Sequence, residues 1–196
     1  MKKKILALTL VFALALALGI GGTVAWLTAK TDPVVNTFTV GDINITLAET
    51  TGNNYTFVPG DTLAKDPKVT VTAGSEDCYL FVKVEEKNNT VNGLTVINWT
   101  VRNGWNPVQG HTGYWYREVT SVTSDREFYV LTGGTTENLN GQVTVNEEVT
   151  KDMVTELTAD KPTITVTAAA VQMDNVNSVA DAWDKLPNTF TGKVTP

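Results

Sequence analysis

The sequence predicts an all-β protein: an antiparallel, jelly-roll-like β-sandwich with one short C-terminal helix. Thr and Val, which are β-branched and suit strands better than helices, supply 32 and 26 of the 196 residues. Apolar and polar residues alternate in many short runs, and turn sequences rich in Gly, Pro, Asn and Asp separate these runs. About eight to ten short strands at this spacing are typical of a sandwich.

The N-terminus has the three parts of an export signal peptide, which we predict over residues 1–25. A basic start at Lys2–Lys4 precedes an apolar run, Ile5–Ile20, and small residues follow that run. The favoured cleavage site consists of Thr23 and Ala25 at positions −3 and −1, with Trp26 as the new N-terminus. One alternative is cleavage after Ala29. The other is an uncleaved membrane anchor, because the uncharged run that ends at Ala29 is long enough to span a bilayer.

The charge balance limits the partners of the exported chain. Cleavage removes three lysines and leaves 12 basic against 21 acidic residues, a net charge of about −9. This balance argues against binding to nucleic acid or to an anionic surface. Since the chain has no second apolar segment of comparable length, we expect contact with a membrane only through the signal segment before cleavage.

An extended arm, residues 26–40, leads into the predicted sandwich domain, residues 41–196. In several predicted strands every second side chain is apolar, as in Ile43, Ile45 and Leu47, and aromatic and β-branched runs indicate the others. The other predicted strands are residues 69–72, 78–84, 94–101, 114–119, 128–131, 143–145 and 163–170. The single cysteine, Cys78, cannot form an intramolecular disulfide, and it shares one strand face with Leu80 and Val82. We therefore predict a buried, unreactive thiol.

One helix is predicted near the C-terminus. Ser178 is a suitable N-cap, and Asp181 follows three residues later. The apolar stripe of this helix consists of Val179, Ala182, Trp183 and Leu186, and Pro187 ends it. We expect Trp183 to pack the helix against the sheet.

Several segments of the chain are similar, in their order, to segments of one known family. They are Gly21–Ala25, Asn36–Gly41, Val58–Asp61 with Lys65–Pro67, Tyr79–Val84, and Ile164–Gln172 with the helix at 180–186. This ordered set resembles the TasA/camelysin family of exported bacterial proteins. It covers both ends and the first half of the exported chain, and residues 100–160 have no counterpart in it.

The resemblance implies a jelly-roll subunit that a signal peptidase of the SipW type releases and that polymerises with itself into fibres of the extracellular matrix or cell surface. Matrix accessory proteins are further possible partners. In such fibres the N-terminal arm of one subunit adds a strand to the sheet of its neighbour. The apolar contacts of the arm would be Val34, Val35, Phe38 and Val40. The alternative is that residues 34–40 form the first strand of their own sheet.

Camelysin-like relatives are sometimes classed as metallopeptidases, and such an activity requires a set of metal ligands. A catalytic zinc usually takes three protein ligands that are rich in histidine. This chain has one histidine, His111, in a Gly-flanked sequence typical of a loop. No His-Glu-x-x-His motif or nucleophile elbow is present. The residues therefore predict no enzyme, no catalytic site, no metal site and no cofactor.

A carbohydrate-binding surface is a further alternative. The aromatic residues Trp99, Trp105, Tyr114, Trp115 and Tyr116 lie close together in the sequence. Strand alternation sends Trp115 to one face and the two tyrosines to the other, so one of these faces could be exposed. Core packing is the more frequent role of such residues.

Overall fold

The computed structural model describes residues 42–51, 58–132, 141–150, 152–153 and 161–193. These residues all belong to one compact unit, Val40–Pro196. The predicted signal peptide and arm lie outside the described residues, so their cleavage and contacts stay predictions. The residues concerned are Thr23, Ala25, Trp26, Val34, Val35, Phe38 and Val40. Within the described part of the chain, no helix has the length and apolar character needed to cross a membrane.

The described unit is mostly β-structure, and all of its paired strands are antiparallel, which confirms the all-β prediction. One sheet has the order β14–β4–β10–β9, where the strands are Thr163–Gln172, Cys78–Lys87, Tyr114–Val119 and Asn106–Pro107. A second has the order β1–β3–β11, which are Ile45–Ala48, Lys68–Val71 and Arg126–Tyr129. A third has the order β2–β13–β7, which are Thr62–Ala64, Gln142–Val145 and Ile97–Asn98. The remaining pairs are β12–β8, Leu131–Thr132 with Thr100–Val101, and β5–β6, Thr90–Val91 with Leu94–Thr95.

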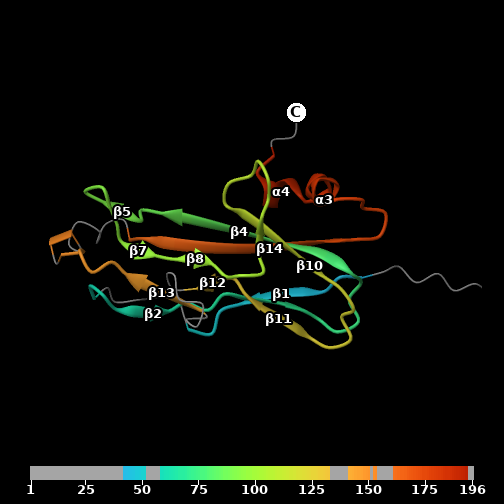
Figure 1. The fold of residues 1–196 in the computed structure, drawn as a ribbon, viewed down its shortest axis with the longest axis horizontal. Coiled ribbons are helices and arrows are strands. Elements are labelled where there is room, and N and C mark those ends of the chain that lie inside the picture. Colours follow the sequence, from blue (N-terminus) through green and yellow to red (C-terminus); the bar gives the residue numbers. More distant parts are fainter. Residues whose placement is uncertain (1–41, 52–57, 133–140, 151, 154–160, 194–196) are drawn as a thin grey trace, which may run out of the picture. The chain divides into compact units, whose positions relative to one another are not determined.

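The main core lies between two layers of strands. Figure 1 shows β4, β10 and β14 on one side of the core, with β1, β11, β2 and β13 on the other. Alternate side chains of β4 enter this core: Cys78, Leu80 and Val82 are fully buried. From the facing layer, Val69 and Val71 of β3 are also fully buried. The predicted face of β4 and the burial of Cys78 are thus confirmed.

A second, smaller core covers the opposite face of β4. Phe81 points to this face and is fully buried beneath helix α3, Val179–Lys185, and helix α4, Asn188–Thr191 (Figure 1). Ser178 caps α3 as predicted, because its side chain accepts a hydrogen bond of 3.1 Å from the backbone N–H of Asp181. Trp183 is buried against Phe81, which confirms its predicted packing role.

The structure differs from the sequence-based expectation in several places. The segment 128–131, expected as one strand, is divided between β11 and β12, which pair with β3 and β8. Helix α4 follows directly after Pro187 and was not predicted, because four residues are too few to show a helical period. The segment 94–101, expected as one strand, is divided among β6, β7 and β8, which pair with three different strands. Leu47 was expected to face inward but is 40% exposed, since β1 is the outermost strand of its sheet.

Candidate functional site

The outer edge of β14 is the most distinctive surface of the described unit. β14 pairs along its full length with β4, from Thr163 opposite Lys87 to Gln172 opposite Cys78. Among the described residues, no strand pairs with its other side. The result is an open edge ten residues long, which is longer than most strands in globular proteins.

The hydrogen bonds of β4 identify which backbone groups of β14 face outward. The N–H of Val84 donates to the carbonyl of Gly113 over 3.0 Å, so Val84 bonds toward the β10 side of β4. Val166, which lies opposite Val84 in β14, must therefore direct its own N–H and C=O away from β4. The same alternation applies to every second residue of the strand. The outward-facing residues are Ile164, Val166, Ala168, Ala170 and Gln172.

This edge lacks the features that usually prevent strands from pairing between molecules. Natural edge strands carry charged residues, proline or bulges, but residues 163–172 contain no charged residue and no proline. Their pairing with β4 runs through ten consecutive positions without a bulge. The side chains of Ile164 and Val166 pack against the main core but remain partly exposed, whereas Val82 of the neighbouring strand is fully buried. The edge therefore offers both backbone hydrogen-bonding groups and partly exposed apolar side chains to an added strand.

In the part of the chain that the structure describes, the facing layer is open on the same side. β1 is the outermost strand of its sheet and lies next to β14. Ile45 of β1 packs against the main core and is only partly buried. An added strand at this side could therefore pair with β14 and also cover apolar side chains of both layers.

His111 packs against an aromatic ring in the described structure. It lies in the turn between β9 and β10, as predicted for a Gly-flanked histidine, and its ring stacks on Trp183 with centroids 4.0 Å apart. A surface pocket of about 430 Å³ adjoins it, lined also by Gln109, Tyr116 and Asp184. The described residues contain no group of three or more His, Cys, Asp or Glu side chains placed to hold a metal ion.

The aromatic residues around β10 serve mainly as packing. Trp115 faces the main core, where it meets Trp99 edge to face at 6.4 Å, and Trp105 is buried there too. Tyr114 and Tyr116 point to the other face, as the alternation predicted, and pack beneath the helices. The Tyr114 hydroxyl donates to the carbonyls of Phe190 and Thr191 at 3.2 Å. Trp105 is buried and the other four are half-buried, so none of these five residues is a fully exposed stacking platform.

Two further polar features have structural roles. Asp66 accepts hydrogen bonds from the backbone N–H groups of Thr50 and Thr51, at 2.9 and 3.2 Å, and from both hydroxyls. Burial by itself would raise the pKa of Asp66, but these hydrogen bonds outweigh burial and hold the pKa below 3.8. Burial, followed by the charge of Asp77, raises the pKa of the Cys78 thiol to about 11. A thiol of this kind is a poor nucleophile at neutral pH.

Sequence reasoning found the β14 strand but not its open edge. The uncharged run 163–172 was visible in the sequence, yet a strand with neighbours on both sides can have the same composition. Only the pairing shows that, within the described ranges, no strand lies on one side of β14. No family model, curated protein or solved structure matches the chain.

Proposed function

We propose that the chain is an exported structural subunit of bacterial extracellular matrix fibres, with a jelly-roll-type sandwich and no catalytic role. A signal peptidase of the SipW type would release it, and the arm at residues 26–40 would then add a strand to a neighbouring copy. The observation that supports this proposal is the open, uncharged edge of β14. An edge of this length needs a partner strand or a means of protection.

The dimensions of the arm and the edge are compatible. The ten residues of β14 extend over about 33 Å at about 3.3 Å per residue. Residues 26–40, fully extended, would reach about 50 Å, which leaves several residues to connect the added strand to its own subunit. Main-chain hydrogen bonds to the outward-facing groups would provide affinity, and alternate apolar side chains of the arm would cover Ile164 and Val166.

Addition to a neighbour produces a polymer, whereas addition to the same subunit does not. A head-to-tail contact uses two different surfaces, here the arm and the β14 edge, so each added subunit offers a new edge. If the arm instead paired with its own sheet, the edge would be closed and the protein would stay monomeric. The assembly state of the exported protein therefore separates the two arrangements.

The first experiment removes the arm. The exported protein and a variant lacking residues 26–40 are compared by sedimentation velocity, negative-stain electron microscopy and circular dichroism. We expect fibres from the exported protein and a folded monomer from the variant. Normal polymerisation of the variant would refute the role of the arm. A variant that is monomeric and also strongly destabilised would show that the arm belongs to its own sheet.

The second experiment changes the edge. Ala168→Pro removes an outward N–H and should abolish fibres while the fold is retained, because proline is tolerated where the N–H of an edge strand faces solvent. The neighbouring substitution Ala169→Pro is the matched control, since the N–H of Ala169 faces Phe81 of β4. It should destabilise the sheet itself by about 3 kcal/mol or more. Fibres from Ala168→Pro that equal those of the parent would mean that another edge accepts the arm.

A further inference from the structure

The chain contains three arginines, Arg102, Arg117 and Arg126, and the fold brings all three to one place. They come from separate parts of the sequence: Arg102 follows β8, Arg117 lies in β10 and Arg126 begins β11. Arg117 and Arg126 share the ring of Phe128, with guanidinium carbons 4.0 and 5.6 Å from its centroid. Arg102 lies 6.0 Å from the ring of Tyr129, which alternates to the face of β11 opposite Phe128. Arg102 is nevertheless close enough to Arg117 to repel its charge.

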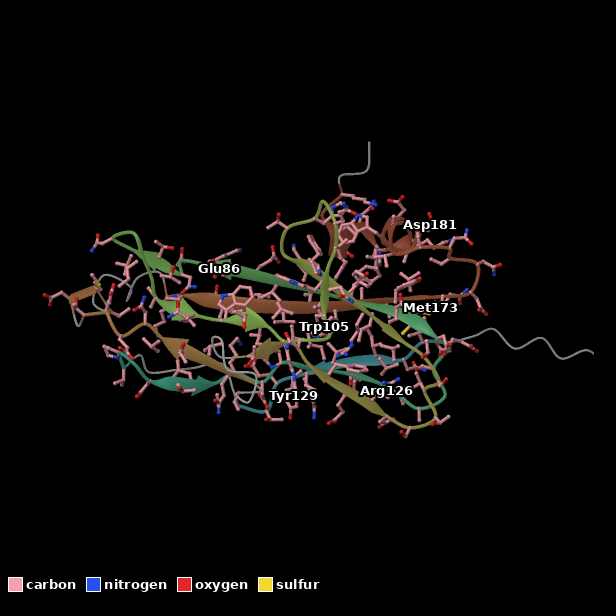
Figure 2. The ribbon with its side chains drawn as sticks, in the orientation of Figure 1. Glu86, Trp105, Arg126, Tyr129, Met173 and Asp181 are labelled. Atoms are coloured by element: carbon pink, nitrogen blue, oxygen red, sulfur yellow. The ribbon has the colours of Figure 1, made fainter. Side chains whose placement is uncertain are left out.

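The cluster lies at the side of the sandwich opposite β14, and two of its members point between the layers. Arg117 is paired with Leu80 and Arg126 with Val71, both of which face the main core. In their sheets, β11 is an outermost strand and β10 is next to the outermost strand β9. Trp105 and Tyr129, labelled with Arg126 in Figure 2, flank the cluster, and Trp105 lies 5.2 Å from the Arg117 guanidinium.

No carboxylate of the described residues forms an ion pair with any of these arginines. The four described ion pairs all use lysine. Glu127, although adjacent to Arg126 in sequence, points to the other face of β11 and pairs with Lys68 at 2.8 Å. Arg126 donates one hydrogen bond of 2.8 Å to the carbonyl of Thr120. The cluster is therefore a concentration of positive charge in an acidic protein.

The environment of Arg117 makes the lack of a counter-charge among the described residues energetically important. Arg117 is partly buried, and burial, followed by repulsion from Arg126 and Arg102, lowers its pKa. A guanidinium remains charged in spite of such a shift, so the cost of desolvation must be offset by a partner. Aromatic rings stabilise the faces of a guanidinium but accept none of its five N–H groups.

Arg117 is half-buried, so part of its side chain reaches solvent. The buried polar atoms of the described residues that lack a hydrogen-bond partner are Gln142 Oε1 and Trp183 Nε1, and no Arg117 nitrogen is among them. Gly104 provides room for the guanidinium: a Cβ at this position would lie 2.8 Å from Arg117 Nη2. The turn at Gly104, whose φ is +91°, thus fits closely around one edge of the side chain.

We propose that Arg102, Arg117 and Arg126 form a binding site for an oxyanion, either a carboxylate or a tetrahedral anion such as sulfate. The guanidinium fork matches two oxygens of such a group, and charge-assisted hydrogen bonds of this kind are strong. The alternative explanation is that inward-pointing charges merely protect an open side from unwanted pairing. That role needs one charge and does not account for three arginines that come from three segments, two of which stack on the ring of Phe128.

The test uses the small number of arginines. The ¹⁵N spectrum of the exported protein should contain three arginine Nε–Hε signals, recorded in solution for monomers or by magic-angle spinning for fibres. We expect all three signals to shift along one saturation curve as sodium sulfate is added at constant ionic strength. The melting temperature should rise by about 5 °C when sulfate exceeds its dissociation constant about fiftyfold. A parallel titration with sodium acetate shows whether a planar carboxylate suffices.

Matched variants separate binding at this site from the general effect of sulfate on proteins. Arg126→Gln removes an exposed member of the cluster and should weaken binding about tenfold. Lys87→Gln removes the same charge from an exposed position of β4 and should leave the saturation curve unchanged. The proposal is overturned if the signals do not shift, if they shift linearly without saturation, or if Arg126→Gln saturates at the parent concentration.

Discussion

Replacement of Trp183 by alanine should remove much of the energy that holds helix α3 on the sheet. Trp183 is only 5% exposed, and its ring lies 4.8 Å from Tyr114 and 6.2 Å from Phe81. Burial of about 240 Å² of tryptophan surface at about 25 cal/mol/Å² corresponds to about 6 kcal/mol. Residual burial in the unfolded chain reduces this to about 4 kcal/mol.

One feature of the ring lowers the expected loss further. The Trp183 Nε1 is buried without a hydrogen-bond partner among the described residues, which costs about 1–2 kcal/mol in the native state. We therefore expect Trp183→Ala to lower the free energy of unfolding by about 2–3 kcal/mol. Urea denaturation followed by circular dichroism, with m-values compared between variants, measures this change.

Two companion variants separate the effect of the unpaired Nε1–H of Trp183 from the effect of its ring. Trp183→Phe keeps a ring and removes the unpaired N–H, so it should cost less than about 1 kcal/mol. Lys185→Ala changes an exposed residue of the same helix and should stay within about 0.5 kcal/mol of the parent. If Trp183→Phe were as costly as Trp183→Ala, Nε1 would have a partner and the argument from the unpaired N–H would fail.

Three further predictions concern other parts of the fold. Cys78 should not react with a thiol reagent at pH 8 until urea unfolds the protein, which alkylation rates can show. Because the pKa of its thiol is raised from 9.0 to about 11, the contribution of the buried thiol to stability is complete below pH 9 and is lost as the pH rises through 11. Unfolding curves at several pH values measure this loss. Gly141→Ala should destabilise the fold by about 2 kcal/mol or more, because the new Cβ would lie 2.8 Å from Asp66 Cα. Gly74 has a similar positive φ but no atom within 4 Å of an added Cβ, so Gly74→Ala should cost only about 1 kcal/mol. Equal losses of unfolding free energy in urea melts would contradict this. Asp66→Asn should reduce the pH dependence of stability in acid. Because the pKa of Asp66 is lowered, its carboxylate stabilises the fold above pH 3.8, and this contribution disappears as the pH falls through the lowered pKa. Unfolding free energies between pH 2 and 6 should therefore vary less in the variant than in the parent.

Local features of the fold could be predicted because their causes lie within a few residues. The alternation of Cys78, Leu80 and Val82 fixed one buried face of β4, and the N-cap Ser178 fixed the start of α3. Both signals depend only on strand or helix periodicity and on side-chain chemistry at one position. Helix α4 was not predicted, because its four residues are too few to show a periodic pattern.

The two candidate sites depended on pairings between distant segments. The pairing of β14 with β4 joins segments about 85 positions apart in the chain, and the uncharged sequence of β14 is compatible with one neighbour or two. Likewise, nothing in the local sequence around Arg102, Arg117 and Arg126 indicates that they meet, since the register of three strands brings them together.

The sequence alone therefore determined the β-class, the buried cysteine and the capped helix, and it predicts export and an N-terminal arm that lies outside the described residues. Only the tertiary structure showed that β14 has an open edge among the described residues, on one side of the sandwich, and that the arginines gather on the other side. The physical reason is that periodicity and capping act over a few neighbouring residues, whereas open edges and charge clusters arise from long-range register.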